Sequence, residues 1–387
     1  MPRTERGALP SPRLRVAIDL SPAVQEHGGI GRYARELARA LQGPDLDLRA
    51  FVVDARRRAP APPLERLPVV ALASANKAWR LRTMLSSFAG QPMDRVVGDV
   101  DVFHGTDHLL PPLARTAAVL TVHDLSHLHV PRTHLPLNRT FLDIMLPRFV
   151  RAADVILAVS ESTRRDVIAT YGVDAERVRT AHLGVDPRYA PPAPARVAEV
   201  RARHGLPARY LLGVGTLEPR KNLKTLLAAF AAIDANDLGL VLVGPRGWRI
   251  EEALGGRDLP AGVRDRVVLT GFVPEDELPA FYGGAEAFAY PSLFEGFGLP
   301  VLEAMACGAA VVASDTTSLP EVVGDAGILV PPTDVDAWVS ALRALLDDPE
   351  RRGRLGAAAR ARAAGFTWEA TAAITRLAYE EARARRS

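Results

Sequence analysis

Short apolar runs rich in β-branched residues alternate with longer amphipathic stretches through the first half of the chain. Apolar runs of about 4 to 8 residues are typical of strands, and apolar residues three and four positions apart are typical of helices. The pattern predicts strands at residues 14–19, 48–53, 100–104, 118–122 and 155–160, and helices most clearly at 31–41 and 162–171. This alternation indicates parallel strands joined by helices.

A proline-rich segment, PRYAPPAPA at residues 187–195, interrupts the alternation. Because proline lacks an N–H group and fixes φ, we interpret this segment as a linker. The alternation then resumes, with strands predicted at 210–214, 239–243, 267–270, 285–290 and 310–313, and helices from Asn222, Glu275, Pro300 and Asp334, the last with a break near Gly365. We therefore predict the α/β class, with two doubly wound, Rossmann-like domains at residues 1–190 and 196–366 that face each other across a cleft.

Length and composition limit the possible classes of protein. The 387 residues suit two domains, and 48% hydrophobic with 24% charged residues excludes a disordered chain or a coiled coil. The single cysteine, Cys307, excludes a disulfide framework and a thiolate metal site. No apolar run is long enough to span a bilayer, and the first dozen residues have no signal-peptide character. We expect a cytoplasmic protein.

The charges are nearly balanced, with 48 basic and 45 acidic residues and a formal net charge of +3. This balance, without a nucleic-acid-binding motif, argues against a nucleic acid partner. Two arginine clusters, residues 56–58 and the tail residues Arg383, Arg385 and Arg386, are candidate contacts with an anionic membrane surface on the inner face of the cytoplasmic membrane. The alternative is that both clusters are solvated surface.

The richest candidate chemistry follows the predicted strand at 285–290, in the segment PSLFEGFGLPVLEAMAC. Ligands of parallel sheets bind beyond the carboxyl ends of strands, and the free N–H groups of a helix start bind anions. Glu295 lies in the loop and Glu303 lies in the following helix, so both can contact one ligand at separate points. The alternative is a plain turn in which Glu303 only complements the helix dipole.

A second strand, glycine turn and helix start form the segment GVGTLEPRKNL at residues 213–223. Arg220 and Lys221 stand together where the helix dipole is positive, which disfavours cations. We interpret this pair as a binding site for an anion, and solvated surface charge is the alternative.

Two further loops carry candidate groups in the first half. Gly28, Gly29 and Gly31 precede an amphipathic helix; the stretch from Gly29 fits the dinucleotide pattern G-x-G-x-x-A, with Asp54 as the ribose-binding acid. That pattern normally follows its strand directly, whereas nine residues separate Asp19 from Gly29. His123 and Asp124 end a predicted strand; the histidine spacing matches no standard zinc motif, so hydrogen bonding or acid–base chemistry is favoured.

Taken together, these segments resemble the retaining glycosyltransferases of the GT-B fold, specifically glycosyltransferase family 4. GGIGRY, HDL, VSESTRRDV, GTLEPRKNL, GFVPEDEL and EGFGLPVLEAMACGAAVVAS occur in the order typical of the family and cover nearly the whole chain. The resemblance implies transfer of a sugar from a nucleotide sugar with retention of anomeric configuration, without a metal or other cofactor. It also implies that the C-terminal helix, about residues 367–387, packs back on the first domain.

The resemblance also implies roles for individual residues. Glu295 would lie beside the sugar, Glu303 would hold the ribose, and His123 would contact the transferred sugar. Arg220 and Lys221 would clamp the diphosphate, and Thr216 replaces an arginine that many members carry. Catalytic roles fall to His123, Glu295, Lys221 and Arg220. The full expected donor-binding set is Gly29, Gly31, Thr216, Arg220, Lys221, Gly244, Phe272, Val273, Leu278, Glu295, Gly296, Phe297, Gly298, Leu299 and Glu303.

The donor and acceptor are less constrained by these motifs. The motif run looks most similar to bacterial mannosyltransferases, so GDP-mannose is the first expectation and a UDP-sugar is the second. The expected acceptor is a saccharide or a lipid-linked saccharide in glycan biosynthesis. Two alternatives are a nicotinamide-dependent oxidoreductase that uses the Gly29–Gly31 stretch and a catalytically silent binding protein of the same fold.

Overall fold

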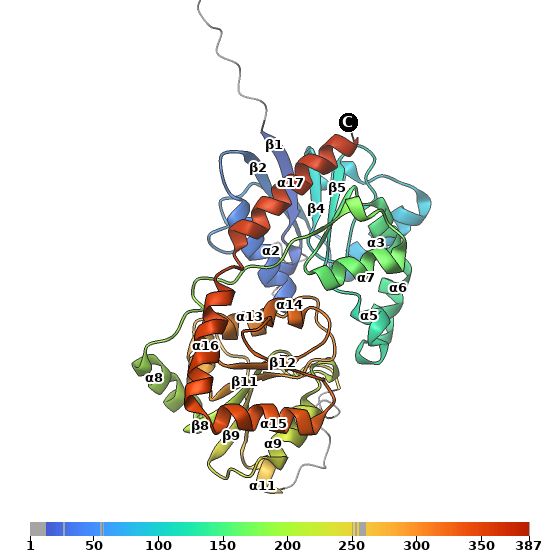
Figure 1. The fold of residues 1–387 in the computed structure, drawn as a ribbon. Coiled ribbons are helices and arrows are strands. Elements are labelled where there is room, and N and C mark those ends of the chain that lie inside the picture. Colours follow the sequence, from blue (N-terminus) through green and yellow to red (C-terminus); the bar gives the residue numbers. More distant parts are fainter. Residues whose placement is uncertain are drawn as a thin grey trace, which may run out of the picture. The chain divides into compact units, whose positions relative to one another are not determined.

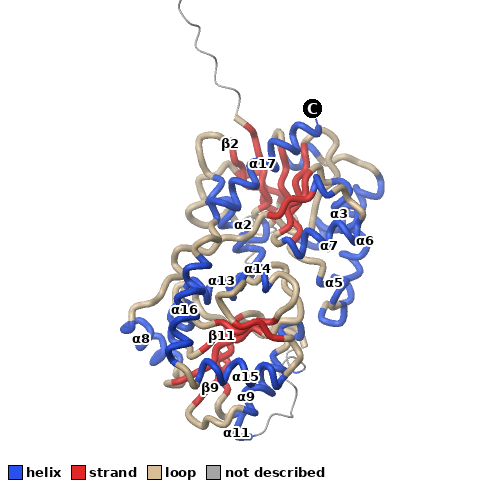
Figure 2. The backbone as a smooth tube through the Cα atoms, in the orientation of Figure 1, coloured by secondary structure: helices blue, strands red, loops and turns tan. Residues whose placement is uncertain are grey.

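The computed structural model describes residues 13–25, 28–54, 56, 58–249, 251, 254 and 261–386, which form two parallel α/β sheets (Figures 1 and 2). The predicted fold class is therefore confirmed. The first dozen residues and Arg57, which entered the predictions on a signal peptide and a membrane contact, lie outside the described residues.

The first sheet has the strand order β3-β2-β1-β4-β5-β6-β7. Its strands are β1 (Leu14–Asp19), β2 (Leu46–Val53), β3 (Val69–Leu72), β4 (Val102–Gly105), β5 (Ala117–Val122), β6 (Val155–Ala158) and β7 (Val178–Thr180). The sequence pattern predicted the central strands because they are buried at nearly every position and are therefore mostly apolar. It missed β3 and β7, which are short edge strands with exposed or half-buried positions.

Helices of the first half alternate with these strands along the chain. They are α1 (Ser21–Val24), α2 (Gly28–Leu41), α3 (Asn76–Ala89), α4 (Asp94–Val97), α5 (Ser126–His129), α6 (Pro136–Ala152) and α7 (Glu161–Tyr171), with 3₁₀ turns η1 (Pro131–Thr133) and η2 (Ala175–Arg177). The helix predicted to begin at Gly31 begins at Gly28 instead. The glycines that we expected in a loop therefore form the first turn of α2.

The second sheet has the order β10-β9-β8-β11-β12-β13 and is parallel throughout. Its strands are β8 (Arg209–Val214), β9 (Leu238–Val243), β10 (Val267–Gly271), β11 (Ala287–Tyr290), β12 (Val311–Ser314) and β13 (Ile328–Val330). The strand order reverses between β8 and β11. Ligands of such sheets bind at this switch point, outside the carboxyl ends of the strands.

The second half of the chain carries the remaining described helices. They are α8 (Pro194–His204), η3 (Pro219–Lys221), α9 (Leu223–Ala232), α11 (Ala261–Arg264), α12 (Leu278–Gly284), α13 (Leu299–Ala306), α14 (Leu319–Val323), α15 (Val335–Leu346), α16 (Pro349–Ala363) and α17 (Trp368–Arg386). Phe230 of α9 and Trp338 of α15 share a buried core with Leu240 and Leu242 of β9. Helix α13 packs against α16, and α12 packs against α8.

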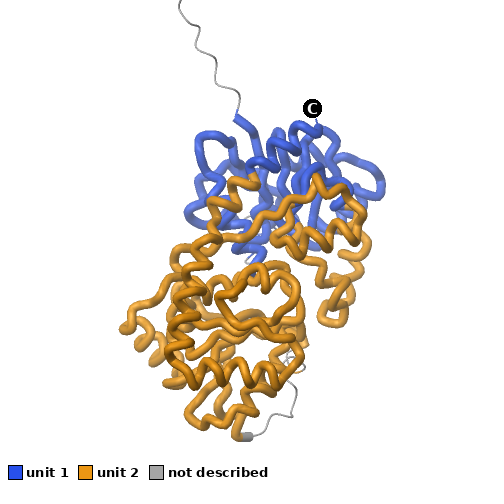
Figure 3. Tube along the Cα trace, in the orientation of Figure 1, with its two compact units in different colours: residues 1–121, 149–156, 376–387 blue, residues 122–148, 157–375 orange. Residues whose placement is uncertain are grey.

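The chain divides into two compact units (Figure 3). Unit 1 contains residues 1–121, 149–156 and 376–387, and unit 2 contains residues 122–148 and 157–375. Within unit 1, the last turns of α17 lie against the first sheet: the hydroxyl of Tyr379 lies 2.8 Å from Nδ1 of His104. Arg376 donates to the carbonyl of Leu41 at the end of α2, at 2.9 Å.

Candidate functional site

The loops after β8 and β11 are joined by hydrogen bonds at the switch point of the second sheet. The backbone N–H of Leu293 donates to the carbonyl of Arg220 at 2.9 Å, and the Ser292 hydroxyl donates to the same carbonyl at 3.2 Å. Asn222 donates from its side chain to the carbonyl of Pro291 at 3.1 Å. These bonds hold the turn η3, which carries both cations, against the loop that carries Glu295.

Glu295 is the centre of a buried charged cluster. One carboxylate oxygen accepts from Nζ of Lys221 at 2.6 Å and from the Ser292 hydroxyl at 2.5 Å. The other oxygen lies 3.1 Å from Nη1 of Arg220. Burial by itself raises the pKa of Glu295, but the attraction of the two cations outweighs it and lowers this pKa to about 2. Glu295 is therefore ionised at neutral pH.

A second carboxylate, Glu218, binds the far side of the Arg220 guanidinium. Nε and Nη2 of Arg220 donate to one Glu218 oxygen at 3.1 and 2.9 Å, and Nη1 donates to the carbonyl of Phe294 at 2.7 Å. Two cations thus face two carboxylates, and these four charges cancel. The sequence interpretation required an external anion for Arg220 and Lys221, whereas here Glu295 contacts both cations and Glu218 contacts Arg220.

Tyr290, the last residue of β11, lies beside Lys221. Nζ of Lys221 donates to the Tyr290 hydroxyl at 2.7 Å and lies 5.0 Å from the centre of the ring. Burial lowers the pKa of Lys221 and raises the pKa of Tyr290 well above its ordinary value. Sequence reasoning did not select Tyr290, Ser292 or Glu218, since nothing in the local pattern distinguishes them from residues of an ordinary strand end or turn.

Close backbone approaches explain the glycines of the EGFG loop. A Cβ atom on Gly296 would lie 1.9 Å from the carbonyl oxygen of His123, far inside van der Waals contact. Gly298 has a φ of +105° immediately before α13, a conformation that disfavours other residues. The Ser318 hydroxyl donates to the carbonyls of Glu295 and Phe297 at 2.9 and 3.0 Å, which fixes the loop from the other side.

Three histidines of unit 2 approach this loop, and the sequence analysis selected one of them. The backbone of His123 abuts Gly296, and the Thr163 hydroxyl donates to the His123 carbonyl at 3.2 Å. The ring of His129 stacks on Phe294 with 5.1 Å between centres and 16° between planes. The ring of His182 lies 5.9 Å from that of Phe297. The fold therefore brings the predicted His123 beside the predicted Glu295 loop.

Glu303 lies on α13, a helix whose residues are almost all buried. Its carboxylate accepts a hydrogen bond of 3.0 Å from the hydroxyl of Tyr282, on α12. Both residues are buried. A contact between Glu303 and a ribose stays a prediction.

A glycine lies at the carboxyl end of each of the strands β8, β9 and β10. Gly215, Gly244 and Gly271 follow or end β8, β9 and β10, and each has a positive φ. A Cβ atom on Gly244 would lie 2.1 Å from the carbonyl oxygen of Gly215, so only glycine allows these two turns to touch. Thr216 follows in the same turn, where its methyl group faces Gly247.

The residues expected near the nucleobase differ in exposure. The Phe272 side chain is 76% exposed, whereas Val273 and Leu278 are buried. Exposure leaves the Phe272 ring open for stacking, and burial makes Val273 and Leu278 part of the core. Contact of these residues with a base stays a prediction.

The expectation that Gly29 and Gly31 belong to a loop is wrong. Both lie in the first turn of α2, and a Cβ atom on Gly31 would lie 2.7 Å from the carbonyl oxygen of Pro22 in α1. Gly31 is therefore required for helix packing. The dinucleotide alternative is also disfavoured, because α1 separates β1 from the glycines and the Asp54 carboxylate binds Arg58 at 3.1 Å.

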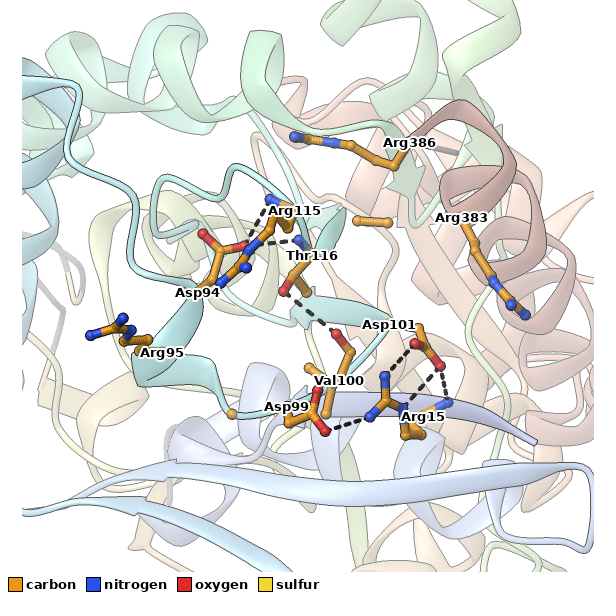
Figure 4. A pocket seen from close by; sticks show the side chains of 12 residues that line it. Arg15, Asp94, Arg95, Asp99, Val100, Asp101, Arg115, Thr116, Arg383 and Arg386 are labelled. Atoms are coloured by element: carbon orange, nitrogen blue, oxygen red, sulfur yellow. Dashed lines mark hydrogen bonds and ion pairs between the residues drawn. The ribbon is translucent and has the colours of Figure 1, made fainter. Parts of the chain in front are cut away.

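A large cavity of 640 Å³ lies in unit 1, at the amino ends of β1, β4 and β5 (Figure 4). Some of its charged side chains are paired: Arg15 pairs with Asp99 and Asp101 at 2.6 and 2.8 Å. Asp94 accepts from the backbone N–H groups of residues 114–116, and its pKa is lowered to about 2 by these bonds against the effect of burial. The cavity lies at the edge of the sheet that does not bind ligands in parallel α/β folds.

Two features are absent from the described part of the chain. No group of three or more His, Cys, Asp or Glu side chains is arranged to hold a metal ion. None of the helices there combines the length and the apolar character needed to cross a bilayer.

Two family descriptions match the chain, one in each half. "Glycosyltransferase Family 4" matches residues 27–189, and "Glycosyl transferases group 1" matches residues 198–362. Every residue of the charged cluster lies within the second match.

Curated relatives and a solved structure extend this similarity. O-antigen chain mannosyltransferase B of Escherichia coli is 37% identical over 284 residues, which cover 72% of this chain and 74% of that protein. A GDP-mannose-dependent alpha-(1-6)-phosphatidylinositol monomannoside mannosyltransferase of Mycolicibacterium smegmatis is 37% identical over 69% of this chain and 73% of that protein. The sucrose-phosphate synthase structure from Thermosynechococcus elongatus has a TM-score of 0.72 at 23% identity and covers 95% of this chain and 98% of its own; at this identity it shows a shared fold.

Proposed function

This chain belongs to glycosyltransferase family 4, a family of retaining nucleotide-sugar glycosyltransferases, and we propose that it transfers mannose from GDP-mannose. The names of two relatives support mannose as the sugar, and one of these names specifies GDP-mannose as the donor. The acceptor is a saccharide or a lipid-linked saccharide. A UDP-sugar is the second candidate donor.

One observation carries this proposal: Arg220 and Lys221 converge on Glu295 at a switch point of the sheet. Departure of a nucleoside diphosphate builds negative charge on its phosphates, and fixed cations in a site with little water stabilise that charge strongly. The diphosphate binds Arg220 and Lys221 and takes over part of their pairing with Glu295. Glu295 is then available to the sugar.

The two cations of the cluster, Arg220 and Lys221, supply to the diphosphate the positive charge that a divalent metal supplies elsewhere. A planar guanidinium and an ammonium bind phosphate oxygens by charge-assisted hydrogen bonds. We expect full activity in EDTA. Activity that vanishes in EDTA and returns with Mg²⁺ would contradict this part of the proposal and reopen Asp124 as a metal ligand.

We assign donor binding and acceptor binding to different halves of the chain. All members of the charged cluster and Glu303 lie within residues 196–366, which we propose as the donor-binding domain. Residues 1–190 then form the acceptor-side domain, with His123 supplied from the loop after β5. The contacts of α17 with His104 and Leu41 support assigning this C-terminal helix to the acceptor-side domain.

The deciding experiment is a donor panel with the purified full chain. Release of nucleoside diphosphate is measured with GDP-mannose, GDP-glucose, UDP-glucose and UDP-galactose, and NAD(H) is tested for binding by thermal shift. We expect release with GDP-mannose above all, and a product with the anomeric configuration of the donor by NMR. Preference for a UDP-sugar would overturn the donor but keep the enzyme class; an inverted product would conflict with a retaining mechanism.

A further inference from the structure

Glu321, on the short helix α14, binds the first turn of another helix of unit 2, α7; both helices are labelled in Figure 1. Its two carboxylate oxygens accept hydrogen bonds from the backbone N–H groups of Glu161 and Ser162, at 2.8 and 2.6 Å. Nε2 of His182 lies 3.2 Å from one of these oxygens. The first N–H groups of an α-helix have no partner within the helix, so this carboxylate satisfies two of them.

The surroundings of Glu321 favour its ionised form. Burial by itself raises the pKa of Glu321, but the hydrogen bonds from His182 and from the two backbone N–H groups outweigh burial and lower this pKa. The positive end of the α7 dipole stabilises the same negative charge. The sequence analysis did not select Glu321, because its partner Glu161 lies 160 positions earlier in the chain.

The same turn of α7 also contacts the EGFG loop that carries Glu295. The hydroxyl of Thr163, a buried residue, lies 3.4 Å from the carbonyl oxygen of Gly296 and 3.2 Å from that of His123. It shares its proton between these two acceptors. Because Glu321 binds the two residues before Thr163, it fixes the turn from which this hydroxyl reaches the loop.

The residues around α14 hold the EGFG loop from a second side. Ser318, which precedes α14, donates to the carbonyls of Glu295 and Phe297 at 2.9 and 3.0 Å. The ring of His182, the side-chain partner of Glu321, lies 5.9 Å from the ring of Phe297. Three consecutive loop carbonyls, from Glu295 to Phe297, thus accept hydrogen bonds from hydroxyls on α7 or beside α14, and Glu321 joins these two helices.

We propose that Glu321 is a positioning residue for the reaction: by binding the first turn of α7, it fixes the backbone that carries Glu295. This inference rests on the proposed function, in which Glu295 acts on the sugar. Glu321 acts through Thr163 and the EGFG loop and does not itself contact the substrate. Such a residue matters for rate, because a displacement of about 1 Å at a reacting group can cost about 100-fold in rate.

Donor binding should depend less on Glu321 than the chemical step does. The turn η3, which carries Arg220 and Lys221, is tied to the carbonyl of Pro291 and to the N–H of Leu293, before the EGFG loop begins. A shift of Glu295 therefore leaves both cations in place for the diphosphate. The proposal predicts a separation between kcat and the affinity for nucleoside diphosphate.

Kinetics and calorimetry of Glu321→Gln with the purified full chain test this separation. The amide keeps the size of the side chain but loses the charge and turns an NH₂ group toward N–H donors. We expect kcat with the donor that the wild type uses to fall about 10- to 100-fold. The Kd of GDP (or of UDP, if the donor panel selects a UDP-sugar) should change by no more than about threefold. Glu350→Gln, at a glutamate side chain 89% exposed on α16, is the control and should behave like the wild type.

Thr163 gives a second test that includes a conservative rescue. Thr163→Val removes the hydroxyl at nearly constant volume and should lower kcat in the same way, whereas Thr163→Ser keeps the hydroxyl and should retain most of the activity. Because Thr163 and Glu321 act through one turn, the double variant Glu321→Gln, Thr163→Val should lose less kcat than the product of the two single losses. If Glu321→Gln does not fold, the two Thr163 variants still decide the outcome.

Hydrogen–deuterium exchange gives a readout that does not depend on activity. In Glu321→Gln without donor, peptides that contain residues 161–163 and 295–297 should exchange faster than in the wild type, while α9 should be unchanged. If the wild type releases no nucleoside diphosphate from any donor but this exchange pattern is found, the proposed function fails and the structural link stands.

Two outcomes would overturn the positioning role. One is wild-type kcat in both Glu321→Gln and Thr163→Val. The other is a fall in GDP or UDP affinity as large as the fall in kcat, which would show a general loss of the donor site. In an inactive wild type, unchanged exchange at residues 295–297 in Glu321→Gln would overturn it as well.

Discussion

Lys221 and Glu295, 74 positions apart in the chain, form an ion pair of 2.6 Å that joins the loops after β8 and β11. The ammonium also donates to Tyr290, and the carboxylate also accepts from Ser292 and faces Arg220. The pair is therefore one part of a network with no net charge. A dianionic diphosphate that enters this network must compete with Glu295 for both cations.

Replacement of Lys221 should reduce the activity strongly. Lys221→Ala removes one of two fixed cations and leaves Glu295 buried with less compensation, so we expect kcat to fall about 100-fold or more. Lys221→Arg should recover only part of this loss, because a planar fork does not fit a site shaped for an ammonium. Lys224→Ala, an exposed lysine on α9, is the control and should keep wild-type kinetics. Wild-type kcat in Lys221→Ala would exclude the clamp.

Arg220 should be nearly as important, because the family resemblance implies that Thr216 replaces an arginine. Arg220→Ala removes the partner of both Glu218 and Glu295, and we expect a loss of kcat/KM that approaches that of Lys221→Ala. If the two positions serve the same phosphate, Thr216→Arg should restore part of the activity of Arg220→Ala. Steady-state kinetics of the two single variants and the double variant measure this coupling; a double variant no better than Arg220→Ala would separate the two positions.

The two glutamates should affect different kinetic constants. Glu295→Gln keeps the size of the side chain and removes its charge beside the proposed position of the reacting sugar, so kcat should fall with little change in donor KM. Glu303→Ala should mainly raise donor KM. Tyr282→Phe removes the hydrogen bond to Glu303 and shows whether an effect of Glu303→Ala is only structural. Unchanged kinetics in both glutamate variants would refute the site.

The charged cluster also predicts how stability depends on pH. The pKa of Glu295 falls from its ordinary 4.5 to about 2 in the folded chain, so folding favours the ionised form. This contribution, about 3 kcal/mol, is complete above about pH 5 and is lost as pH falls toward about 2. In denaturant unfolding, the free energy of unfolding of the wild type should therefore fall more between about pH 5 and about pH 2 than that of Glu295→Gln. Parallel pH dependence of the two proteins would show that the carboxylate is not stabilised as described.

Gly296 tests the contact between the His123 strand end and the Glu295 loop. In Gly296→Ala the new Cβ would lie 1.9 Å from the His123 carbonyl, so the loop must shift. We expect a loss of stability of about 2 to 3 kcal/mol together with loss of activity. Gly353→Ala, at an exposed α16 glycine with open space around it, should instead gain up to about 1 kcal/mol by helix propensity. Thermal unfolding of both variants gives the comparison.

Local sequence already contains the α/β class, the central strands and the main reactive loops. Central strands of a parallel sheet are buried on both faces, so β5, β6 and β9 are almost entirely apolar and can be predicted without tertiary information. Glu295 and Lys221 could be selected for a related reason, because each lies in a strand, loop and helix start whose shape is encoded within a few residues.

Tertiary structure alone decided which charges meet and which faces stay exposed. Glu218 and Tyr290 joined the site because parallel strands far apart in sequence bring their carboxyl ends to one edge of the sheet, and no local pattern records that pairing. The same cause turned an expected anion site into a neutral cluster, since Glu295 reaches both cations across the β8–β11 switch point. Likewise, the apolar residues of α3 match an ordinary buried helix in sequence; only the packing of Trp79 on Phe51 shows that Leu81, Leu85 and Phe88 face outward.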